Sequence, residues 1–212
     1  MNRYDFIAIE GVIGVGKTSL ARLLSERHNA RLVLEQFEEN PFLPHFYEDR
    51  ERYAFQTQLA FLASRFKQQE VLRNRDLFQE MVISDYLFEK DRIFARLNLS
   101  GDEMALYDSI YGIMNSIAAK ADLVVFIQST VDRLMQNIKA RGRPYEKEIS
   151  RVYIEELNDA YNHFFHHYTR SPLLIVNASE VDFVRDESHL KYIEDEIFLQ
   201  PLRSNTTHII PR

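Results

Sequence analysis

The sequence contains no cysteine. It therefore forms no disulfide, offers no thiol nucleophile and cannot hold zinc or an iron–sulfur cluster through cysteine ligands. The absence is compatible with a reducing compartment such as the cytosol. Any chemistry in this protein must come from other side chains.

The sequence also lacks an excess of positive charge and any long apolar run. Its 26 lysines and arginines face 32 aspartates and glutamates, which gives a net charge of −6. Such a chain has no general attraction for nucleic acid or for an anionic membrane, so any anion site must be local. No apolar run approaches the roughly 18 residues of a membrane span, and Met1–Glu10 is typical of a strand rather than of a secretory signal. We expect a cytoplasmic protein without nucleic-acid or membrane partners.

Short apolar runs alternate along the 212 residues with longer segments of helical period. The runs are rich in Val, Ile and Leu and show no polar alternation, which is typical of strands buried on both faces. They are Phe6–Ile9, Leu32–Leu34, Met81–Ile83, Leu123–Ile127 and Leu173–Val176. This order predicts an α/β fold of three layers, with a five-stranded parallel sheet between helices.

The length of the chain and the lack of a linker suggest one domain over residues 1–200. Helices are expected from about Arg50 to Arg73, and from Gly101 to about Lys120 after a capping box at Ser100. Ser129 with Asp132 marks another expected helix start. The segment 201–212 is polar and punctuated by prolines, so we expect a loosely held tail.

A phosphate-binding loop follows the first predicted strand. The pattern G-x-x-x-x-G-K-[ST] is matched in full, and a predicted helix follows it, which is the context that the motif requires. Its residues, with the serine that follows, are Gly11, Val12, Ile13, Gly14, Val15, Gly16, Lys17, Thr18 and Ser19. Glycines let backbone N–H groups converge on phosphate oxygens, and the helix N-terminus adds partial positive charge. We expect Lys17 to reach the β- and γ-phosphates of ATP and Thr18 to ligate Mg²⁺ directly.

A triphosphate site does not by itself specify a reaction. The Asp-x-x-Gly and Asn-Lys-x-Asp strings of GTP-driven switches do not occur in this sequence. The run Val82-Ile83-Ser84 ends in Asp85, so this carboxylate is expected near the Mg²⁺ shell, through a water molecule.

Three features mark a possible acceptor side, and each has a structural alternative. Glu35 ends the second predicted strand and is either a general base or a solvated loop carboxylate. Gln58 and Arg65 lie two turns apart on one helix face and either read a polar ligand or bond to neighbouring backbone. Gly142 between two arginines is either part of a lid over a phosphoryl group or a helix C-cap.

Together these residues resemble the deoxyribonucleoside kinase family, particularly its bacterial purine-preferring members. The resemblance runs from the first strand to about Phe183. It rests on the order and spacing of the following residues: Glu35, Tyr47, Gln58, Arg65, Ser84-Asp85-Tyr86, Arg141-Gly142-Arg143 and Asp182-Phe183. It implies a P-loop kinase fold with a short arginine-rich lid at about 139–150. It also implies an enzyme that uses ATP with Mg²⁺ to phosphorylate the 5′-hydroxyl of a deoxynucleoside in nucleotide salvage, with deoxyadenosine or deoxyguanosine favoured.

The resemblance also implies roles for single residues. Glu35 matches the general base, while Arg141 and Arg143 match lid arginines that join Lys17 and Asp85 in catalysis. On the acceptor side, Gln58 matches the residue that pairs with the nucleobase, with Arg65 beside it, and Phe94 matches the aromatic that stacks on the base. Tyr47 and Glu146 match the pair that holds the sugar 3′-hydroxyl. Asp182 and Phe183 resemble the loop that lies against the donor adenine.

The sequence departs from the family pattern at three positions. Gln36 stands where many members have proline, and Tyr86 stands where they have an arginine after the acidic residue of strand three. The role of that arginine passes to Lys90, to Arg92, or to neither. A further lid arginine of many members falls at Asn137.

Two other functions compete with the nucleoside kinase. A nucleoside monophosphate kinase of the thymidylate type would need cations for the acceptor phosphate, for which Arg65, Lys90 and Arg92 are available. A nucleotide-binding switch is weaker because its base-reading strings are absent.

A homodimer is expected from the apolar surface of the two long helices. The contributing residues are Phe61, Phe66, Ile110, Tyr111, Ile113, Met114 and Ile117. The alternative is that the two helices pack on each other within one subunit.

Overall fold

The computed structural model describes residues 4–73, 81–200 and 206–211. In this part of the chain, six strands form one parallel sheet in the order β2-β3-β1-β4-β5-β6. The strands are β1 (Phe6–Gly11), β2 (Arg31–Val33), β3 (Val82–Ser84), β4 (Leu123–Gln128), β5 (Leu173–Asn177) and β6 (Thr206–Ile209). The first five coincide with the predicted apolar runs to within a residue or two, which confirms the α/β parallel architecture.

The prediction of five strands is wrong, because β6 adds a sixth at the edge of the sheet. β6 pairs in parallel with β5 in the register Leu173↔Thr206 to Val176↔Ile209. It lies in the segment 201–212 that was expected to be loosely held, so that expectation fails for Thr206–Ile209. Residues 201–205 and 212 lie outside the described residues. A strand at the edge of a sheet pairs with only one neighbouring strand and is less buried than a central strand, so it does not need an apolar run. The sequence Thr-Thr-His-Ile of β6 shows no such run.

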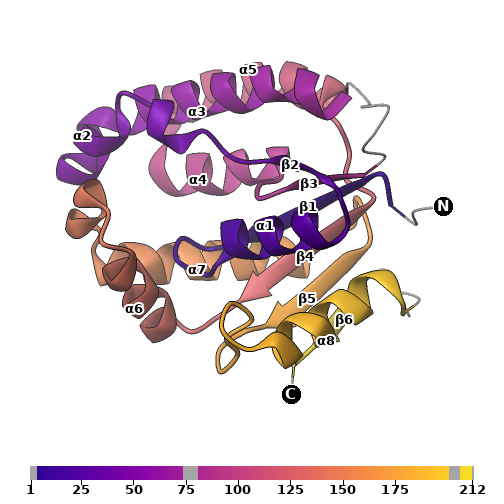
Figure 1. The fold of residues 1–212 in the computed structure, drawn as a ribbon. Helices are drawn as coiled ribbons and strands as arrows, with labels where there is room; N and C mark the ends of the chain where they lie inside the picture. The colour runs from indigo at the N-terminus through magenta and orange to yellow at the C-terminus, as the bar shows by residue number, and fades with distance from the viewer. Residues whose placement is uncertain (1–3, 74–80, 201–205, 212) are drawn as a thin grey trace.

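Helices flank the sheet on both faces (Figure 1). They are α1 (Lys17–Arg27), α2 (Leu43–Glu48), α3 (Arg50–Arg73), α4 (Asp91–Asn98), α5 (Gly101–Ile117), α6 (Val131–Arg141), α7 (Arg151–His166) and α8 (Glu187–Phe198), with the 3₁₀ turns η1 (Phe37–Glu39), η2 (Phe88–Lys90) and η3 (Pro144–Glu148). In Figure 1, α1 and α8 lie on the viewer's side of the sheet and α7 on the far side, while α3 and α5 run side by side above it. The predicted bounds of α3 are confirmed.

Two predicted helix starts differ in detail. α5 begins at Gly101 as expected, but the Ser100 side chain makes no capping hydrogen bond. α6 is capped by Thr130, whose hydroxyl accepts from the Arg133 N–H, rather than by Ser129. Thr130 is the residue directly before the first helical turn, where a side-chain oxygen reaches the free N–H groups.

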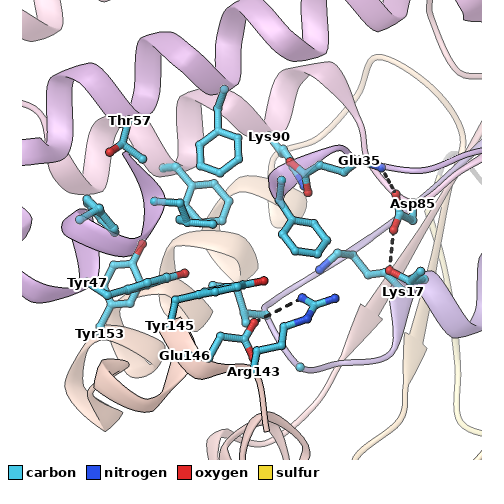
Figure 2. A pocket seen from close by; sticks show the side chains of 18 of the residues that line it. Lys17, Glu35, Tyr47, Thr57, Asp85, Lys90, Arg143, Tyr145, Glu146 and Tyr153 are labelled. Carbon is cyan, nitrogen blue, oxygen red and sulfur yellow. Dashed lines mark hydrogen bonds and ion pairs between the residues drawn. The ribbon is translucent and has the colours of Figure 1, made fainter. Parts of the chain in front are cut away.

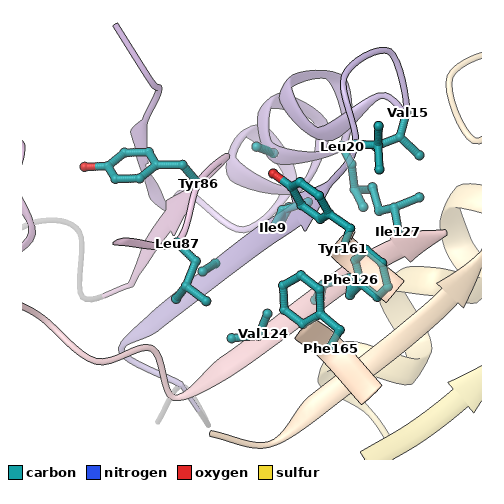
Figure 3. Close-up of a cluster of buried hydrophobic side chains, with 14 of the residues drawn as sticks. Ile9, Val15, Leu20, Tyr86, Leu87, Val124, Phe126, Ile127, Tyr161 and Phe165 are labelled. Carbon is teal, nitrogen blue, oxygen red and sulfur yellow. The ribbon is translucent and has the colours of Figure 1, made fainter. Parts of the chain in front are cut away.

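The core packs α7 against the centre of the sheet. Phe126 of β4 stacks on Phe165 of α7 with ring centroids 4.2 Å apart, and Tyr161 packs beside both (Figure 3). All six residues of β1 are buried, as expected for a central parallel strand covered on both faces. Within the described ranges, no helix has both the length and the apolarity needed to cross a membrane.

The parallel sheet determines where functional side chains gather. Because the strands run in one direction, the carboxyl ends of β1, β2 and β3 meet at one edge. The phosphate loop follows β1, Glu35 lies two residues after β2, and Asp85 directly follows β3. Three segments that are far apart in the sequence therefore meet at this edge.

Candidate active site

The phosphate loop has the backbone that its glycines allow. Gly14 and Gly16 adopt φ angles of +87° and +104°, a left-handed region that favours glycine. A Cβ on Gly16 would lie 2.9 Å from the ring of Phe183, so this glycine also makes room for the later loop. α1 begins at Lys17, whose Nζ donates to the carbonyl oxygens of Gly11 (2.7 Å) and Val12 (3.3 Å). The loop N–H groups and the positive end of α1 thus share one concave surface.

Hydrogen bonds join the phosphate loop to the ends of β2 and β3. The Thr18 hydroxyl donates to Oδ2 of Asp85 (2.5 Å), and the other oxygen of Asp85 accepts from the backbone N–H of Glu35 (2.7 Å). Asp85 therefore holds Thr18 and Glu35 in a defined arrangement at the edge of the sheet.

Glu35 is surrounded by cations. Its Oε1 accepts from two nitrogens of Arg65, with the Nε contact at 2.8 Å, and its Oε2 accepts from Lys90 Nζ at 2.7 Å. Burial raises the pKa of Glu35, but the charges of Arg65 and Lys90 outweigh it and hold the pKa well below its usual range. The carboxylate is consequently ionised throughout the neutral range.

Asp91 completes this cluster and was not identified from the sequence. It is fully buried at the start of α4 and forms an ion pair with Arg65. Burial raises the pKa of Asp91 to about 6, against the opposing charge of Arg65. No motif marks Asp91, because its pairing with a residue 26 positions earlier depends on how α3 packs against α4. Arg65 thus bridges two carboxylates.

A cavity extends from the phosphate loop along α3 to the segment that contains Arg141 and Glu146. Of the residues assigned to catalysis or to the acceptor, the following line it: Lys17, Thr18, Glu35, Tyr47, Gln58, Arg65, Asp85, Phe94, Arg141, Arg143 and Glu146. In Figure 2, Lys17, Asp85, Glu35 and Lys90 lie along one side of the cavity, and Tyr47, Tyr153, Tyr145 and Glu146 lie along another. The structure therefore brings together, in one cavity, residues predicted for the phosphoryl donor and residues predicted for the acceptor.

Gln58 lies in the wall of this cavity with unused hydrogen-bonding capacity. It is 2% exposed, and its Oε1 atom accepts no hydrogen bond from any described residue. Buried amide oxygens are normally satisfied, so this one is suited to a donor group on a ligand. The cavity is otherwise rich in aromatic rings, among them Phe94 and Tyr161, which meet edge to face.

The lid arginines share one acidic partner. Arg141 donates to both carboxylate oxygens of Glu146, at 3.0 Å from its Nε and 2.5 Å from its Nη2, and Arg143 donates to Oε1 at 3.4 Å. The guanidinium of Arg143 also lies 4.2 Å from the ring centroid of Phe37. Gly142 between them is the left-handed C-cap of α6, which confirms the capping alternative, while the lid stays a prediction.

Asp182 and Phe183 lie away from this cavity, in a second hollow beyond the phosphate loop. Asp182 accepts from the backbone N–H groups of Val184 (3.2 Å) and Arg185 (3.0 Å), which shapes the turn. Asn137 lines the same hollow and donates to the carbonyl oxygen of Gly14 (2.9 Å). At this position the chain bonds to its own phosphate loop instead of presenting an arginine.

Lys90 and Arg92, the two candidates for the role of the missing arginine, differ in position. Lys90 lines the cavity and contacts Glu35. Arg92 instead pairs with Asp108 of α5 at 3.0 Å and lies by a separate groove between α4 and α7. The two side chains are only two residues apart in the sequence, yet they point to different parts of the molecule.

Comparison with known proteins identifies relatives over nearly the whole chain. The family model described as deoxynucleoside kinase matches residues 7–200. The chain is 34% identical over 198 residues to deoxyguanosine kinase of Bacillus subtilis, covering 91% of this chain and 96% of that protein. It is 32% identical over 197 residues to deoxyadenosine kinase of Dictyostelium discoideum, covering 90% and 78%. The structure of deoxyadenosine kinase from M. mycoides with bound dATP superposes with a TM-score of 0.80 at 26% identity, covering 91% and 98%.

Proposed function

This chain belongs to the deoxynucleoside kinase family, and on that premise we propose that it transfers the γ-phosphoryl group of ATP to the 5′-hydroxyl of a purine deoxynucleoside. The observation that carries the proposal is the cavity that runs from Lys17 and Thr18, past Glu35, to Gln58. A phosphoryl donor held by the loop and a nucleoside held by α3 would meet beside Glu35. The product is the 5′-monophosphate, as nucleotide salvage requires.

In the reaction, the 5′-oxygen attacks the γ-phosphorus. The new O–P bond forms as the bond to the bridging oxygen breaks, and its electron pair leaves on ADP. The proton of the 5′-hydroxyl passes to the Glu35 carboxylate. A carboxylate with a lowered pKa is a weak base, which is adequate in a loose transition state where the hydroxyl loses its proton late. Glu35 therefore acts mainly by orienting the hydroxyl, since phosphoryl transfer depends chiefly on positioning and charge stabilisation.

Three cationic side chains surround the expected path of the phosphoryl group. Lys17 holds the β- and γ-phosphates, and Arg141 and Arg143 approach from the lid. Guanidinium groups match the geometry of phosphate oxygens and stabilise the charge that spreads over them in the transition state. Glu146, which now binds both arginines, would release them toward the phosphates and hold the 3′-hydroxyl of the sugar together with Tyr47.

The residues at the loop also fit a magnesium ion. The Thr18 hydroxyl and the Asp85 carboxylate are hard oxygen donors, and their hydrogen bond shows that both point to one spot beside the loop. Thr18 would bind the ion directly and Asp85 through a water molecule. A bound Mg²⁺ neutralises negative charge on the β- and γ-phosphates and helps to align them.

Gln58 and Phe94 are proposed to recognise the base. A glutamine amide has one acceptor and two donor hydrogens, which complement the mixed edge of a purine. The free Oε1 of Gln58 suits an amino or imino donor of the base, and Phe94 offers a ring for stacking. The purine preference is supported by relatives whose names specify deoxyguanosine and deoxyadenosine. Asp182 and Phe183 are proposed to contact the adenine of ATP in the second hollow.

The charge balance of the cavity disfavours a nucleoside monophosphate as acceptor. Arg65 is paired with both Glu35 and Asp91, Lys90 is paired with Glu35, and Arg92 lies outside the cavity. Before transfer, while Glu35 and Asp91 keep their charge, the pairs of Arg65 and Lys90 are balanced, so neither cation is left over for a phosphate that the acceptor already carries.

We also propose a cytoplasmic homodimer that forms through α5. Leu106, Ile113 and Ile117 are 52%, 73% and 45% exposed, and all three lie on this helix. Not every residue expected at the interface remains available. Phe61 lines the cavity, and Tyr111 is buried and stacks on Phe88. The apolar surface is therefore narrower than the sequence suggested, and it is confined to one face of α5.

The proposed function is tested by offering the purified protein Mg·ATP with each of the four deoxynucleosides and each of their four 5′-monophosphates, and following ADP release. We expect turnover with deoxyguanosine or deoxyadenosine. Turnover with a monophosphate alone would contradict the proposal and assign the protein to the nucleotide kinases. No turnover with any of the eight would favour a different acceptor or a nucleotide-binding switch.

A further inference from the structure

Lys90 is a buried lysine whose charge the proposed mechanism has not yet used. It is 2% exposed and lines the cavity, with its Nζ atom 2.7 Å from Oε2 of Glu35. Burying an ammonium group is costly unless it is paired. Glu35, however, is already paired with Arg65 through two hydrogen bonds, so its single charge is shared by two cations. Arg65 has Asp91 as a second partner, so the two cations and two carboxylates balance, and among the described residues Lys90 is paired with Glu35 alone.

The position of Lys90 relative to the phosphate loop is set by Glu10. One carboxylate oxygen of Glu10 accepts from the N–H of Gly11 (3.1 Å), and the other accepts from the N–H of Leu87 (2.6 Å). Leu87 begins the turn that carries Lys90, and its carbonyl accepts from the Lys90 N–H at 3.1 Å. The start of the phosphate loop and the turn η2 are thereby tied together through one fully buried side chain.

Lys90 and Lys17 lie near each other in the cavity wall. Both line the cavity beside Glu35, and Figure 2 shows them on the same side of it, with Glu35 and Asp85 near them. The charge of Lys90 contributes, after burial, to the lowered pKa of Lys17, which is a further sign of their closeness. Lys17 belongs to the donor end of the path and Lys90 to the acceptor end.

We propose that Lys90 is a catalytic residue whose ammonium group stabilises the phosphoryl group as it reaches the 5′-oxygen and then holds the 5′-phosphate of the product. The inference rests on the proposed function and extends it to the acceptor end of the reaction. In the ground state, Glu35 compensates the charge of Lys90. When the hydroxyl proton has passed to Glu35, that compensation is lost, and the arriving phosphoryl oxygens take its place. The charge of Arg65 stays compensated during this step, because Asp91 remains its partner.

Under this assignment, Lys90 interacts more strongly with the transition state and with the product than with the free nucleoside. Only such a differential interaction raises kcat. Lys90 therefore supplies the positive charge that the sequence lacks at Tyr86, where the side chain is buried and carries no charge at neutral pH.

The test compares Lys90→Met, Lys90→Gln and Lys90→Arg with the unaltered protein. Glutamine can still donate a hydrogen bond to Glu35, so Lys90→Gln tests the loss of charge alone. It also keeps the test valid if Lys90→Met fails to fold. Lys67→Met, an exposed lysine of α3, and Arg92→Met are matched controls. The measurements are kcat and KM for the better purine deoxynucleoside, the Kd of that nucleoside and of its 5′-monophosphate, and Tm.

We expect Lys90→Met and Lys90→Gln to lower kcat by about 10²-fold, as removal of other charge-stabilising groups does. In both variants the Kd of the monophosphate should rise at least about tenfold, because the monophosphate carries the phosphate that Lys90 holds. The Kd of the nucleoside, which has no phosphate, should change less than about threefold. Lys90→Arg should recover part of both losses, and the two controls should behave as the unaltered protein does.

Two results would overturn the inference while leaving the proposed function intact. One is an unchanged kcat in the glutamine variant. The other is an equal weakening of nucleoside and monophosphate, which would show that Lys90 only maintains the shape of the cavity. Failure of the unaltered protein to phosphorylate any deoxynucleoside would refute the proposed function first, and this extension with it.

Discussion

The Oγ1 atom of Thr18 donates a 2.5 Å hydrogen bond to Oδ2 of Asp85, 67 residues further along the chain. The bond joins the first turn of α1 to the end of β3. It brings a hydroxyl and a carboxylate together beside the phosphate loop, and Asp85 also accepts from the backbone N–H of Glu35. One aspartate thus joins the phosphate loop to the segment that follows β2.

Asp85→Asn is expected to raise the Mg²⁺ concentration needed for half-maximal activity by about tenfold, because loss of an outer ligand's charge weakens metal affinity. Asparagine keeps an oxygen for the Glu35 N–H, so the loop should stay in place. Activity is measured against Mg²⁺ at constant ATP. The exposed Asp132→Asn serves as the control. An unaltered Mg²⁺ requirement would remove Asp85 from the metal shell.

Glu35→Gln is expected to lower kcat by about 10² to 10⁴-fold if Glu35 accepts the hydroxyl proton. The substitution also leaves Arg65 and Lys90 with a neutral partner, so Tm should fall. Steady-state kinetics and thermal unfolding are compared with Glu39→Gln, an exposed carboxylate nearby. A wild-type kcat in Glu35→Gln would exclude Glu35 from proton transfer.

Lys17→Ala is expected to abolish detectable turnover while the protein remains folded. The backbone of the loop does not depend on the Lys17 side chain, which donates only to the carbonyl oxygens of Gly11 and Val12. Circular dichroism and Tm report on the fold, and ADP release reports on turnover. Turnover within tenfold of the unaltered protein would mean that the lysine does not contact the transferring phosphate.

The affinity for ATP is expected to fall as the pH rises through about 8. Burial, with the nearby charge of Lys90, lowers the pKa of Lys17 to about 8. Below this pH the free protein carries the ammonium that binds phosphate. Above it, the proton must be regained on binding, which weakens affinity by up to about tenfold per pH unit.

Calorimetric titration with Mg·ATP across this range measures the effect. Lys17→Arg is the control, because a guanidinium stays charged and should remove the pH dependence. An affinity for ATP that is independent of pH in the unaltered protein would show that Lys17 keeps its proton throughout.

Ile113→Asp is expected to convert the proposed dimer into a monomer, because a carboxylate at the most exposed apolar position of α5 would be buried without a partner. Light scattering at micromolar concentration measures the mass. Val152→Asp, which alters a 61% exposed valine on α7, is the matched control and should leave the mass unchanged. A monomeric mass for the unaltered protein would refute the dimer.

Local patterns in the sequence were sufficient for the architecture and the phosphate loop. Strands such as Leu123–Gln128 are buried on both faces, so their composition alone identifies them. The loop from Gly11 to Thr18 is similarly determined by its own residues, because its backbone N–H groups and glycine conformations form the site. The edge strand Thr206–Ile209 escaped prediction, because pairing with β5 rather than composition makes it a strand.

The surroundings of Glu35 depend on tertiary packing that no local pattern encodes. The sequence offered Lys90 and Arg92 as equal candidates, and the path of η2 into α4 turned one into the cavity and the other toward Asp108. Asp91 carried no signal at all, since its role depends on Arg65 reaching it from α3. The fold class and the phosphate loop could therefore be predicted, because local patterns of residues specify them. Which charges meet around Glu35 depended on packing between distant elements, because ion pairs are specified by distance in space rather than along the chain.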